Sequence, residues 1–115
     1  MNLNDVVQNL GLEVKAGSDA LDTEVNGGYV SDLMSDVIAH GREGDLWVTL
    51  QTHQNTIAVA SLKGLAGIII VNGRQPEADT LTKAGVENVV LLASELPAFE
   101  LVGRLYKLGL SGMRT

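Results

Sequence analysis

Hydrogen-bonding side chains are densest in residues 49–55, which read Thr-Leu-Gln-Thr-His-Gln-Asn. This stretch leaves an apolar segment and leads into an expected helix, whose free backbone N–H groups can receive an anion or another polar ligand. A second polar segment follows the next apolar run, where Gly73 can adopt a positive φ and Arg74 can clamp a phosphate or a carboxylate. We therefore expect ligand contacts from Thr52, His53, Gln54, Asn55, Asn72, Gly73 and Arg74, with Ser31, Thr49 and Gln51 placed behind them.

Structural interpretations compete with this binding site. Asn55 or Thr56 would simply cap the helix, with solvated polar neighbours, and residues 72–74 would form an ordinary turn with an exposed arginine. His53 is also a candidate general base, but a base needs an orienting partner and a substrate within reach, and the sequence identifies neither. His40 falls near the end of an expected helix, where a cation is favourable, and we interpret it as structural.

Motifs of common catalytic and nucleotide sites are missing from the sequence. It has no phosphate-binding P-loop and no G-x-S-x-G elbow, and the pair Gly27 and Gly28 lacks the third glycine of a dinucleotide fingerprint. The lack of cysteine removes disulfides, thiolate metal sites and cysteine nucleophiles. Asp32 and Asp36 lie at helical spacing, but two carboxylates without a third ligand suit a solvated helix face better than a metal. We therefore expect no catalytic residue and no metal, and the sequence identifies no cofactor.

Short helices and strands alternate along the chain and must position the polar segments. A continuous β-branched run such as residues 68–71 is typical of a parallel strand covered on both faces. In the first half of the chain we expect a helix capped by Asn2 or Asn4 and ended by Gly11, a strand over 12–15, an extended segment over 23–30 with a turn or bulge at 26–28, and an α-helix or 3-10 helix over 31–38 capped by Ser31. In the second half we expect strands over 45–50, 64–71 and 86–92 and helices over 56–63, 77–84 and 97–108, the second of these helices ended by Gly85.

From residue 45 onward the expected order is β-α-β-α-β-α. This order predicts an α/β fold with a small, largely parallel sheet flanked by helices. Ligands of such sheets collect beyond the carboxyl ends of the strands, which here are residues 51–55, 72–75 and 93–95. The length of 115 residues leads us to expect a single domain over 1–115.

Charge and composition exclude several kinds of partner. The formal net charge is −6, from 8 basic and 14 acidic residues, and the basic residues are scattered, which argues against binding to nucleic acid. The longest apolar run, residues 67–71, is far shorter than the roughly 20 apolar residues of a membrane span. The N-terminus lacks the basic start and apolar core of a signal peptide. These features, together with the lack of cysteine, lead us to expect a cytoplasmic protein.

The last expected helix carries apolar residues beyond those that its own core needs. A core-facing stripe at three- and four-residue steps consists of Ala98, Leu101, Val102, Leu105 and Leu108. Phe99 and Tyr106 widen the apolar surface beyond this stripe, and they cover either the rim of the chain's own core or a partner. Because the sheet is small, we expect a homodimer that uses Phe99, Val102 and Tyr106.

Three segments resemble the DRTGG domain family. They are residues 28–37 (GYVSDLMSDV), 44–55 (GDLWVTLQTHQN) and 65–74 (LAGIIIVNGR), and the resemblance continues into the last helix. Its strongest part is a strand after Gly-Asp-Leu, a polar loop that opens a helix, and an Ala-Gly-Ile-Ile strand that ends at a glycine loop. Gly73 keeps the family's naming pattern, whereas His53 and Gln54 replace its Asp-Arg pair. The resemblance implies a fold related to the N-terminal domains of HPr kinase and of the Mur ligases.

The resemblance also implies a setting for the protein. Domains similar to this one usually accompany an enzyme, such as a phosphotransacetylase or a CBS-containing pyrophosphatase, and look like regulatory or dimerising modules. Stand-alone members similar to this chain occur in anaerobic bacteria near redox and hydrogenase-type proteins. A metabolic or redox enzyme is therefore the partner that the resemblance implies.

These observations lead to three hypotheses. The first is a non-catalytic regulatory module that binds a small anionic or nucleotide-like ligand at the carboxyl ends of the strands. The second is a protein-interaction or dimerisation module that docks on a metabolic or redox enzyme through the last helix, without a small ligand. The third is an enzyme that acts through His53.

Overall fold

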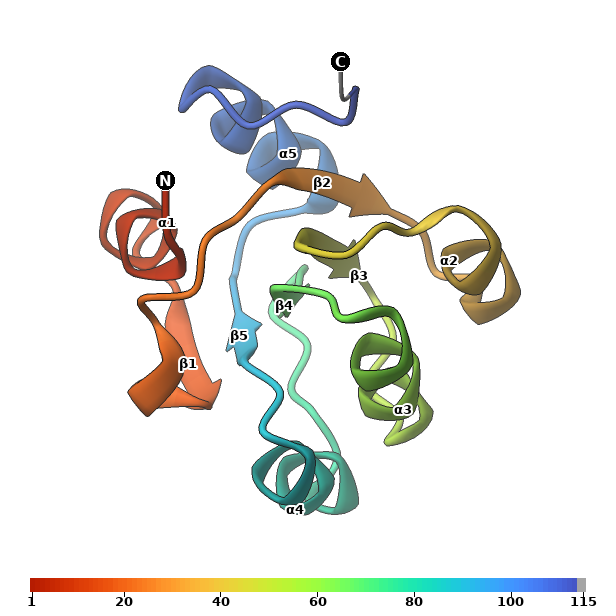
Figure 1. Ribbon diagram of the computed structural model, residues 1–115. Coiled ribbons are helices and arrows are strands. Elements are labelled where there is room, and N and C mark those ends of the chain that lie inside the picture. Colours follow the sequence, from red (N-terminus) through yellow and green to blue (C-terminus); the bar gives the residue numbers. More distant parts are fainter. Residues whose placement is uncertain (114–115) are drawn as a thin grey trace.

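The chain folds into a five-stranded sheet with helices on both faces (Figure 1). The structure is a computed structural model and describes residues 1–113. The strands are β1 (Glu13–Ala16), β2 (Gly27–Val30), β3 (Asp45–Thr49), β4 (Gly67–Ile70) and β5 (Leu91–Ala93). Their spatial order is β1-β5-β4-β3-β2, in which β2 to β5 run parallel and β1 pairs antiparallel with β5. The expected α/β class with a largely parallel sheet is confirmed.

Helices divide between the two faces of the sheet. They are α1 (Leu3–Leu10), the short 3-10 helix η1 (Ser18–Ala20), α2 (Met34–His40), α3 (Asn55–Lys63), α4 (Ala78–Glu87) and α5 (Ala98–Lys107). Buried side chains of α2, α3 and α4 pack on one face, and those of α1 and α5 pack on the other (Figure 1).

Neighbouring residues of the central strands face opposite cores. Leu46 and Val48 of β3 pack with α1 and α5, whereas Trp47 between them packs with α2, α3 and α4. Residues 68–70 of β4 alternate in the same way, and all of these side chains are buried. The unbroken apolar runs follow from this arrangement, because a parallel strand covered on both faces has no solvent side.

Capping residues set the bounds of α1 as the sequence predicts. The side chain of Asn2 accepts the N–H of Asp5 at 2.9 Å, and the carboxylate of Asp5 accepts the N–H of Asn2 at 3.0 Å. This reciprocal pair satisfies two N–H groups that the first turn leaves without helical partners. Gly11 ends the helix in the left-handed region, with φ of 63°.

Residues 26–28 do not form the expected turn or bulge, and that prediction is wrong. Gly27 and Gly28 open β2, which pairs with β3 in a regular parallel register. The N–H of Gly28 donates to the carbonyl oxygen of Ser111 at 3.2 Å, and a Cβ on Gly28 would lie 3.6 Å from the side chain of Leu110. The segment after α5 therefore lies along the outer edge of the sheet, at a distance that would also accept a Cβ at residue 28.

Ser31 is not the N-cap of a helix, so that prediction is also wrong. The helix α2 begins at Met34, with Leu33 in the N-cap position. The N–H of Ser31 donates to the carbonyl oxygen of Val48 at 3.3 Å, which extends the pairing of β2 with β3, and its hydroxyl accepts the N–H of Leu33 at 3.1 Å. Because the sheet holds the backbone of Ser31, the helix starts later.

Gly85 does not end α4, and β5 does not begin at residue 86. The helix continues to Glu87 and ends at Asn88, which has φ of 57°. Asparagine tolerates the left-handed region better than most residues because its short polar side chain can hydrogen-bond locally. The helix therefore runs through the glycine and stops at the asparagine, and β5 begins at Leu91.

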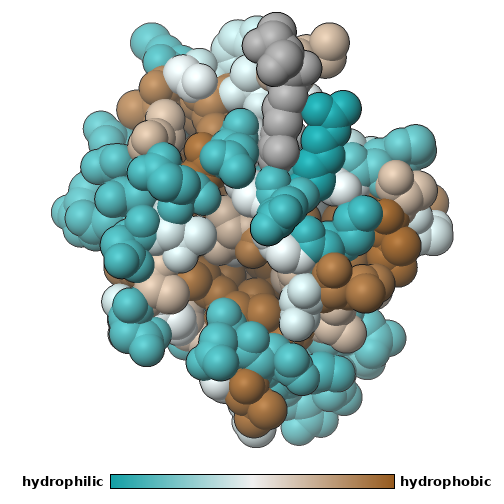
Figure 2. All heavy atoms as spheres, in the orientation of Figure 1, coloured by the Kyte–Doolittle hydropathy of each residue, from teal (hydrophilic) through white to brown (hydrophobic). Residues whose placement is uncertain are grey.

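The surface seen in Figure 2 is largely hydrophilic, with apolar residues at the upper left over the region of α5, at the right near α2 and in the central hollow. In residues 1–113, no helix is both long and apolar enough to cross a membrane.

Candidate functional site

The segments that follow β2, β3, β4 and β5 meet at one edge of the sheet. We call it the carboxyl edge, and it comprises residues 31–33, 50–54, 71–76 and 94–97. Hydrogen bonds join these segments: Nη1 of Arg74 donates to the carbonyl oxygen of Leu50, and the N–H of Asn72 donates to that of Leu96, each at 2.8 Å. The structure thus brings together the two polar segments that the sequence singles out.

The turn before α3 is held by its own hydrogen bonds. Nδ1 of His53 accepts the N–H of Asn55 at 3.1 Å, and the carbonyl oxygen of His53 accepts the hydroxyl of Thr56 at 2.8 Å. Gln54 occupies the N-cap position and makes no side-chain cap bond. The interpretation of Asn55 or Thr56 as the cap is therefore wrong, because the ring of His53 satisfies an N–H at the start of the helix. His53 and Asn55 are exposed.

Thr52 is tied to the start of α4. Its hydroxyl donates to Oε2 of Glu77 at 3.3 Å, and its carbonyl oxygen accepts the N–H of Glu77 at 3.2 Å and the hydroxyl of Thr80 at 2.7 Å. Thr80 is fully buried. These bonds fasten the segment after β3 to α4, so Thr52 already has structural partners.

The turn after β4 uses two consecutive residues with positive φ. Asn72 has φ of 65° and Gly73 has φ of 70°, which confirms the expected conformation of Gly73. The N–H of Gly73 donates to the carbonyl oxygen of Ser94 at 2.9 Å. A Cβ on Gly73 would lie 2.6 Å from Oε2 of Glu95, so this carboxylate lies against the turn. Arg74 is exposed and places one cation on the carboxyl edge.

Asp32 organises the ends of β2 and β3, a role that the sequence reasoning missed. Its Oδ1 accepts the hydroxyl of Thr49 at 2.9 Å and the N–H of Leu50 at 2.7 Å, and its carbonyl oxygen accepts Nε2 of Gln51 at 2.8 Å. Thr49 and Gln51 therefore bind Asp32. An acidic residue just beyond a strand end was the available signal, but we interpreted Asp32 as part of a helix.

Carboxylates outnumber cations on the carboxyl edge. Asp32, Glu77 and Glu95 lie on it or beside it, and Arg74 is the cation that reaches the same segments. This balance disfavours a simple anion and favours a ligand that also brings hydrogen-bond donors or its own cation.

The carboxylate of Asp36, near this edge, ties β2 to α2. The hydroxyl of Tyr29 donates to Asp36, with distances of 2.9 and 3.0 Å to the two carboxylate oxygens. The hydroxyls of Ser31 and Tyr29 lower the pKa of Asp36, because they hydrogen-bond to its charged form. The bond to Asp36 in turn raises the pKa of Tyr29. This pair therefore stabilises the junction of strand and helix while Asp36 is ionised.

Neither a metal centre nor a catalytic dyad emerges from the part of the chain that the structure describes. In residues 1–113, no three His, Cys, Asp or Glu side chains lie close enough together to hold a metal ion. The ring of His53 hydrogen-bonds to a backbone N–H, whereas a catalytic base is usually oriented by a carboxylate.

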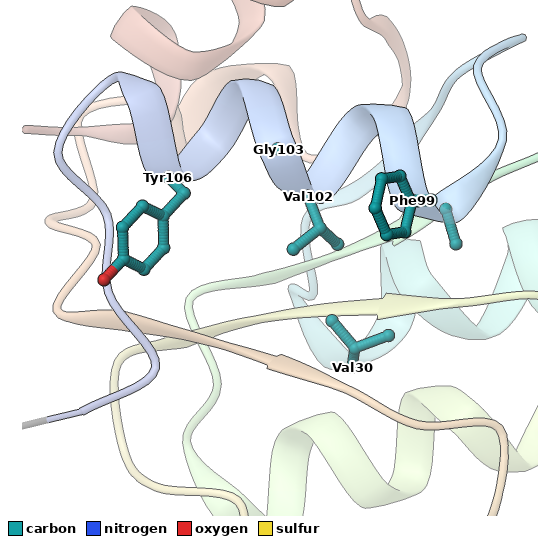
Figure 3. Close-up of a pocket in the computed structure, with 6 residues that line it drawn as sticks. Val30, Phe99, Val102, Gly103 and Tyr106 are labelled. Carbon is teal, nitrogen blue, oxygen red and sulfur yellow. The ribbon is translucent and has the colours of Figure 1, made fainter.

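Apolar side chains of α5 and β2 line an open groove of 610 Å³. We call it the α5 groove, and its lining residues are Val30, Ala98, Phe99, Val102, Gly103 and Tyr106. Phe99, Val102 and Tyr106 project from the side of α5 that looks toward β2, and Val30 projects toward them (Figure 3). The exposed fractions are 92% for Phe99, 69% for Tyr106 and 51% for Val30. Phe99 therefore does not cover the rim of the chain's own core.

The apolar surface continues from the α5 groove along the outer strand. A second hollow of 130 Å³ shares Val30, Val102 and Tyr106 with the groove and extends to the segment after α5, at Leu110. Because β2 is the last strand on its side of the sheet, the whole surface lies at an edge that another molecule can approach.

Comparison with known proteins shows a likeness of fold but no match in sequence. No protein-family model matches the sequence, and no curated protein sequence matches it. The fold is similar to a crystal structure of the CBS and DRTGG domains of the regulatory region of Clostridium perfringens pyrophosphatase, complexed with its activator diadenosine tetraphosphate. The TM-score is 0.67 at 13% sequence identity, over 90% of this chain and 45% of the other.

This likeness shows the fold alone. It supports a DRTGG-like arrangement, as the resemblance in sequence implies. This chain corresponds to less than half of the pyrophosphatase regulatory chain. The activator and the enzyme belong to that protein, and the part that matches is regulatory.

Proposed function

We propose that this domain is a non-catalytic regulatory module that acts through protein contacts made by the α5 groove. The exposure of Phe99 and Tyr106 in an apolar groove at the edge of the sheet carries this proposal. Burial of apolar surface is the dominant favourable term in most protein association, and aromatic anchors supply much of the binding energy of an interface. The likeness to a pyrophosphatase regulatory region supports a regulatory role, and a metabolic or redox enzyme is the regulated partner we propose.

Paired isolation experiments test this function. The tagged parent, Phe99→Ser/Tyr106→Ser and the control Leu62→Ser/Val86→Ser are used to isolate bound proteins from the native cells. Leu62 and Val86 are matched controls because they are 71% and 73% exposed on other helices. We expect the parent and the control to retain an enzyme that the groove variant loses, and the purified parent to change the rate of that enzyme. The same bound proteins for all three, or an unchanged rate, would refute the proposal.

A second candidate function is recognition of a small ligand at the carboxyl edge. The exposed side chains of His53 and Asn55 and the guanidinium of Arg74 favour it. His53 and Asn55 lie at the start of α3 and Arg74 bonds to Leu50, so all three are at the edge where ligands of parallel sheets bind. The nucleotide activator of the pyrophosphatase region makes a nucleotide-like ligand the class to try first. The surrounding carboxylates require such a ligand to arrive with a cation or with hydrogen-bond donors.

Thermal unfolding tests this second candidate. The parent is heated with nucleotides, acyl phosphates and coenzyme A, each with and without a divalent cation. A compound that binds only the native state raises stability by about 2.7 kcal/mol at 100 times its dissociation constant. We expect a rise that Arg74→Ala and Asn55→Ala reduce, with little change in the stability of the unliganded variants. A rise of equal size in the parent and both variants would remove the carboxyl edge as the site.

A further inference from the structure

The apolar stripe of α5 is symmetric about its own midpoint. Phe99 and Tyr106 lie equally far along the helix from the point midway between Val102 and Gly103, and all four residues line the α5 groove. When two identical helices pack antiparallel about a two-fold axis at that midpoint, each Phe99 faces the Tyr106 of the other copy. Each Val102 then faces a Gly103. The stripe is therefore complementary to itself in this orientation, which is the requirement of a two-fold interface.

No contact within a single copy of the chain requires a glycine at position 103. A Cβ at this position would meet no atom within 4 Å, and the residue lies inside α5. Glycine inside a helix costs about 0.8–1.0 kcal/mol relative to alanine. On the face of the α5 groove, the absence of a side chain at Gly103 leaves room for the close approach of another backbone.

The charges beside the stripe also complement one another in the antiparallel orientation. Glu100, Arg104 and Lys107 are exposed and lie on one flank of the helix, with the acid toward its N-terminus and the two bases toward its C-terminus. Rotation about the two-fold axis brings this flank against the same flank of the other copy, so that Glu100 lies near Arg104 and Lys107 of the other helix. A parallel pair would instead turn this flank away from the same flank of the other copy, so the acid and the bases would not meet.

We propose that a second copy of this chain occupies the α5 groove, with the two α5 helices packed antiparallel about an axis between Val102 and Gly103. This inference rests on the proposed function, because it names the molecule that fills the same groove. The dimer is then the unit that engages the regulated enzyme. A stable interface buries roughly 800 Å² on each partner, a small part of the 6037 Å² that the chain exposes. The apolar surface that continues to Leu110 widens the contact beyond the two helices.

Charge reversal on the flank tests this arrangement. Glu100→Lys gives a flank with basic residues only, and Arg104→Glu/Lys107→Glu gives a flank with acidic residues only. We expect the parent to be a dimer in sedimentation equilibrium and each variant alone to dimerise at least about tenfold more weakly, because like charges then face one another. An equimolar mixture of the two variants should form heterodimers, which shows that both variants are folded.

A glycine pair supplies a matched control. Gly85 also lies inside a helix, α4, and a Cβ there would also meet no atom within 4 Å. Gly103→Leu should abolish the dimer, since the larger side chain separates the two helices at the axis, whereas Gly85→Leu should leave it intact. Both variants should keep the far-ultraviolet circular dichroism of the parent.

The outcomes separate this inference from the proposed function. A monomeric parent, or a dimer that survives both charge variants and Gly103→Leu, overturns the α5 pairing. If the parent is monomeric and an enzyme is still lost with Phe99→Ser/Tyr106→Ser, the regulatory function stands and the groove takes the enzyme directly. If the dimer behaves as proposed and no enzyme responds to it, the regulatory function fails and the α5 pairing stands.

Discussion

The carboxylate of Asp32 accepts the hydroxyl of Thr49 at 2.9 Å, and this bond ties the end of β2 to the end of β3. Thr49 is 1% exposed, so water does not readily replace the lost partner. We expect Asp32→Ala to lower the free energy of unfolding by about 1–3 kcal/mol, because the hydroxyl of Thr49, which still accepts the N–H of Gln51, loses the acceptor for its own proton. Asp32→Asn keeps an acceptor oxygen and should cost less.

Urea denaturation of the parent and the Asp32 variants measures these differences. Asp22→Ala is the control, since Asp22 is also exposed but lies in a turn away from the carboxyl edge. Equal stability of Asp32→Ala and Asp22→Ala would contradict the role of Asp32.

The pair of Tyr29 and Asp36 predicts a dependence of stability on pH. The folded state lowers the pKa of Asp36, so its contribution is present above the ordinary value of 3.8 and is lost as the pH falls through the lowered pKa. Tyr29→Phe removes one of the two hydroxyls that cause this shift. We expect the pKa of Asp36 to rise in Tyr29→Phe, and the variant to be less stable than the parent at neutral pH.

Two measurements check this prediction. The carboxyl carbon of Asp36 is titrated by NMR in the parent and in Tyr29→Phe, and thermal unfolding is followed from neutral to acid pH. The difference in melting temperature between the two proteins should shrink as Asp36 becomes protonated. A difference that stays constant across this range would show that the loss comes from packing of the ring instead.

Two glycines with positive φ should differ in their tolerance of alanine. Gly17 has φ of 85°, and a Cβ there would lie 2.8 Å from the backbone Cα of Val90, which cannot move without shifting the sheet. Gly73 has φ of 70°, but its nearest atom is the carboxylate of Glu95, the end of an exposed flexible side chain. We expect Gly73→Ala to cost about 1–2 kcal/mol, from the left-handed conformation alone, and Gly17→Ala to cost clearly more in urea denaturation. The opposite order would contradict this account.

Asn88 ends α4 in the left-handed region, with φ of 57°. Asn88→Gly should leave stability unchanged or raise it slightly, because glycine adopts this conformation without steric cost. Asn88→Val should lower the free energy of unfolding by about 1–2 kcal/mol, because a branched Cβ crowds the carbonyl oxygen. Thermal unfolding measures both, and an equal effect of the two substitutions would show that another feature ends the helix.

Most of the elements that were predicted correctly could be recognised from residue patterns within the segment itself. Residues 68–70 show no polar alternation, so the burial of β4 on both faces could be read from that segment alone. The errors arose where a residue that commonly breaks regular structure is held by a distant segment. Gly27 and Gly28 extend because β3 pairs with them, and Ser31 stays extended because it bonds to Val48.

In the candidate site, too, the sequence predicted the positions of the polar segments but not the contacts between their side chains. The polar segments at 49–55 and 72–74 were found because they follow buried strands, and the parallel sheet necessarily brings such ends to one edge. The sequence could not show that Asp32 binds Thr49, or that the ring of His53 accepts the N–H of Asn55, because side-chain direction decides both contacts. Nor could it show that three carboxylates, those of Asp32, Glu77 and Glu95, lie on or beside the edge that Arg74 reaches.

The α/β class, the order of most elements and the surplus apolar residues on the last helix could all be predicted from the chain alone. Hydrophobic period and capping residues act over a few positions, so they can be read directly from the chain. The open groove that Phe99 and Tyr106 line with Val30 could be recognised only in the folded chain, because it depends on how α5 lies relative to the edge strand. Contacts between distant segments follow from packing, and packing is a property of the whole chain.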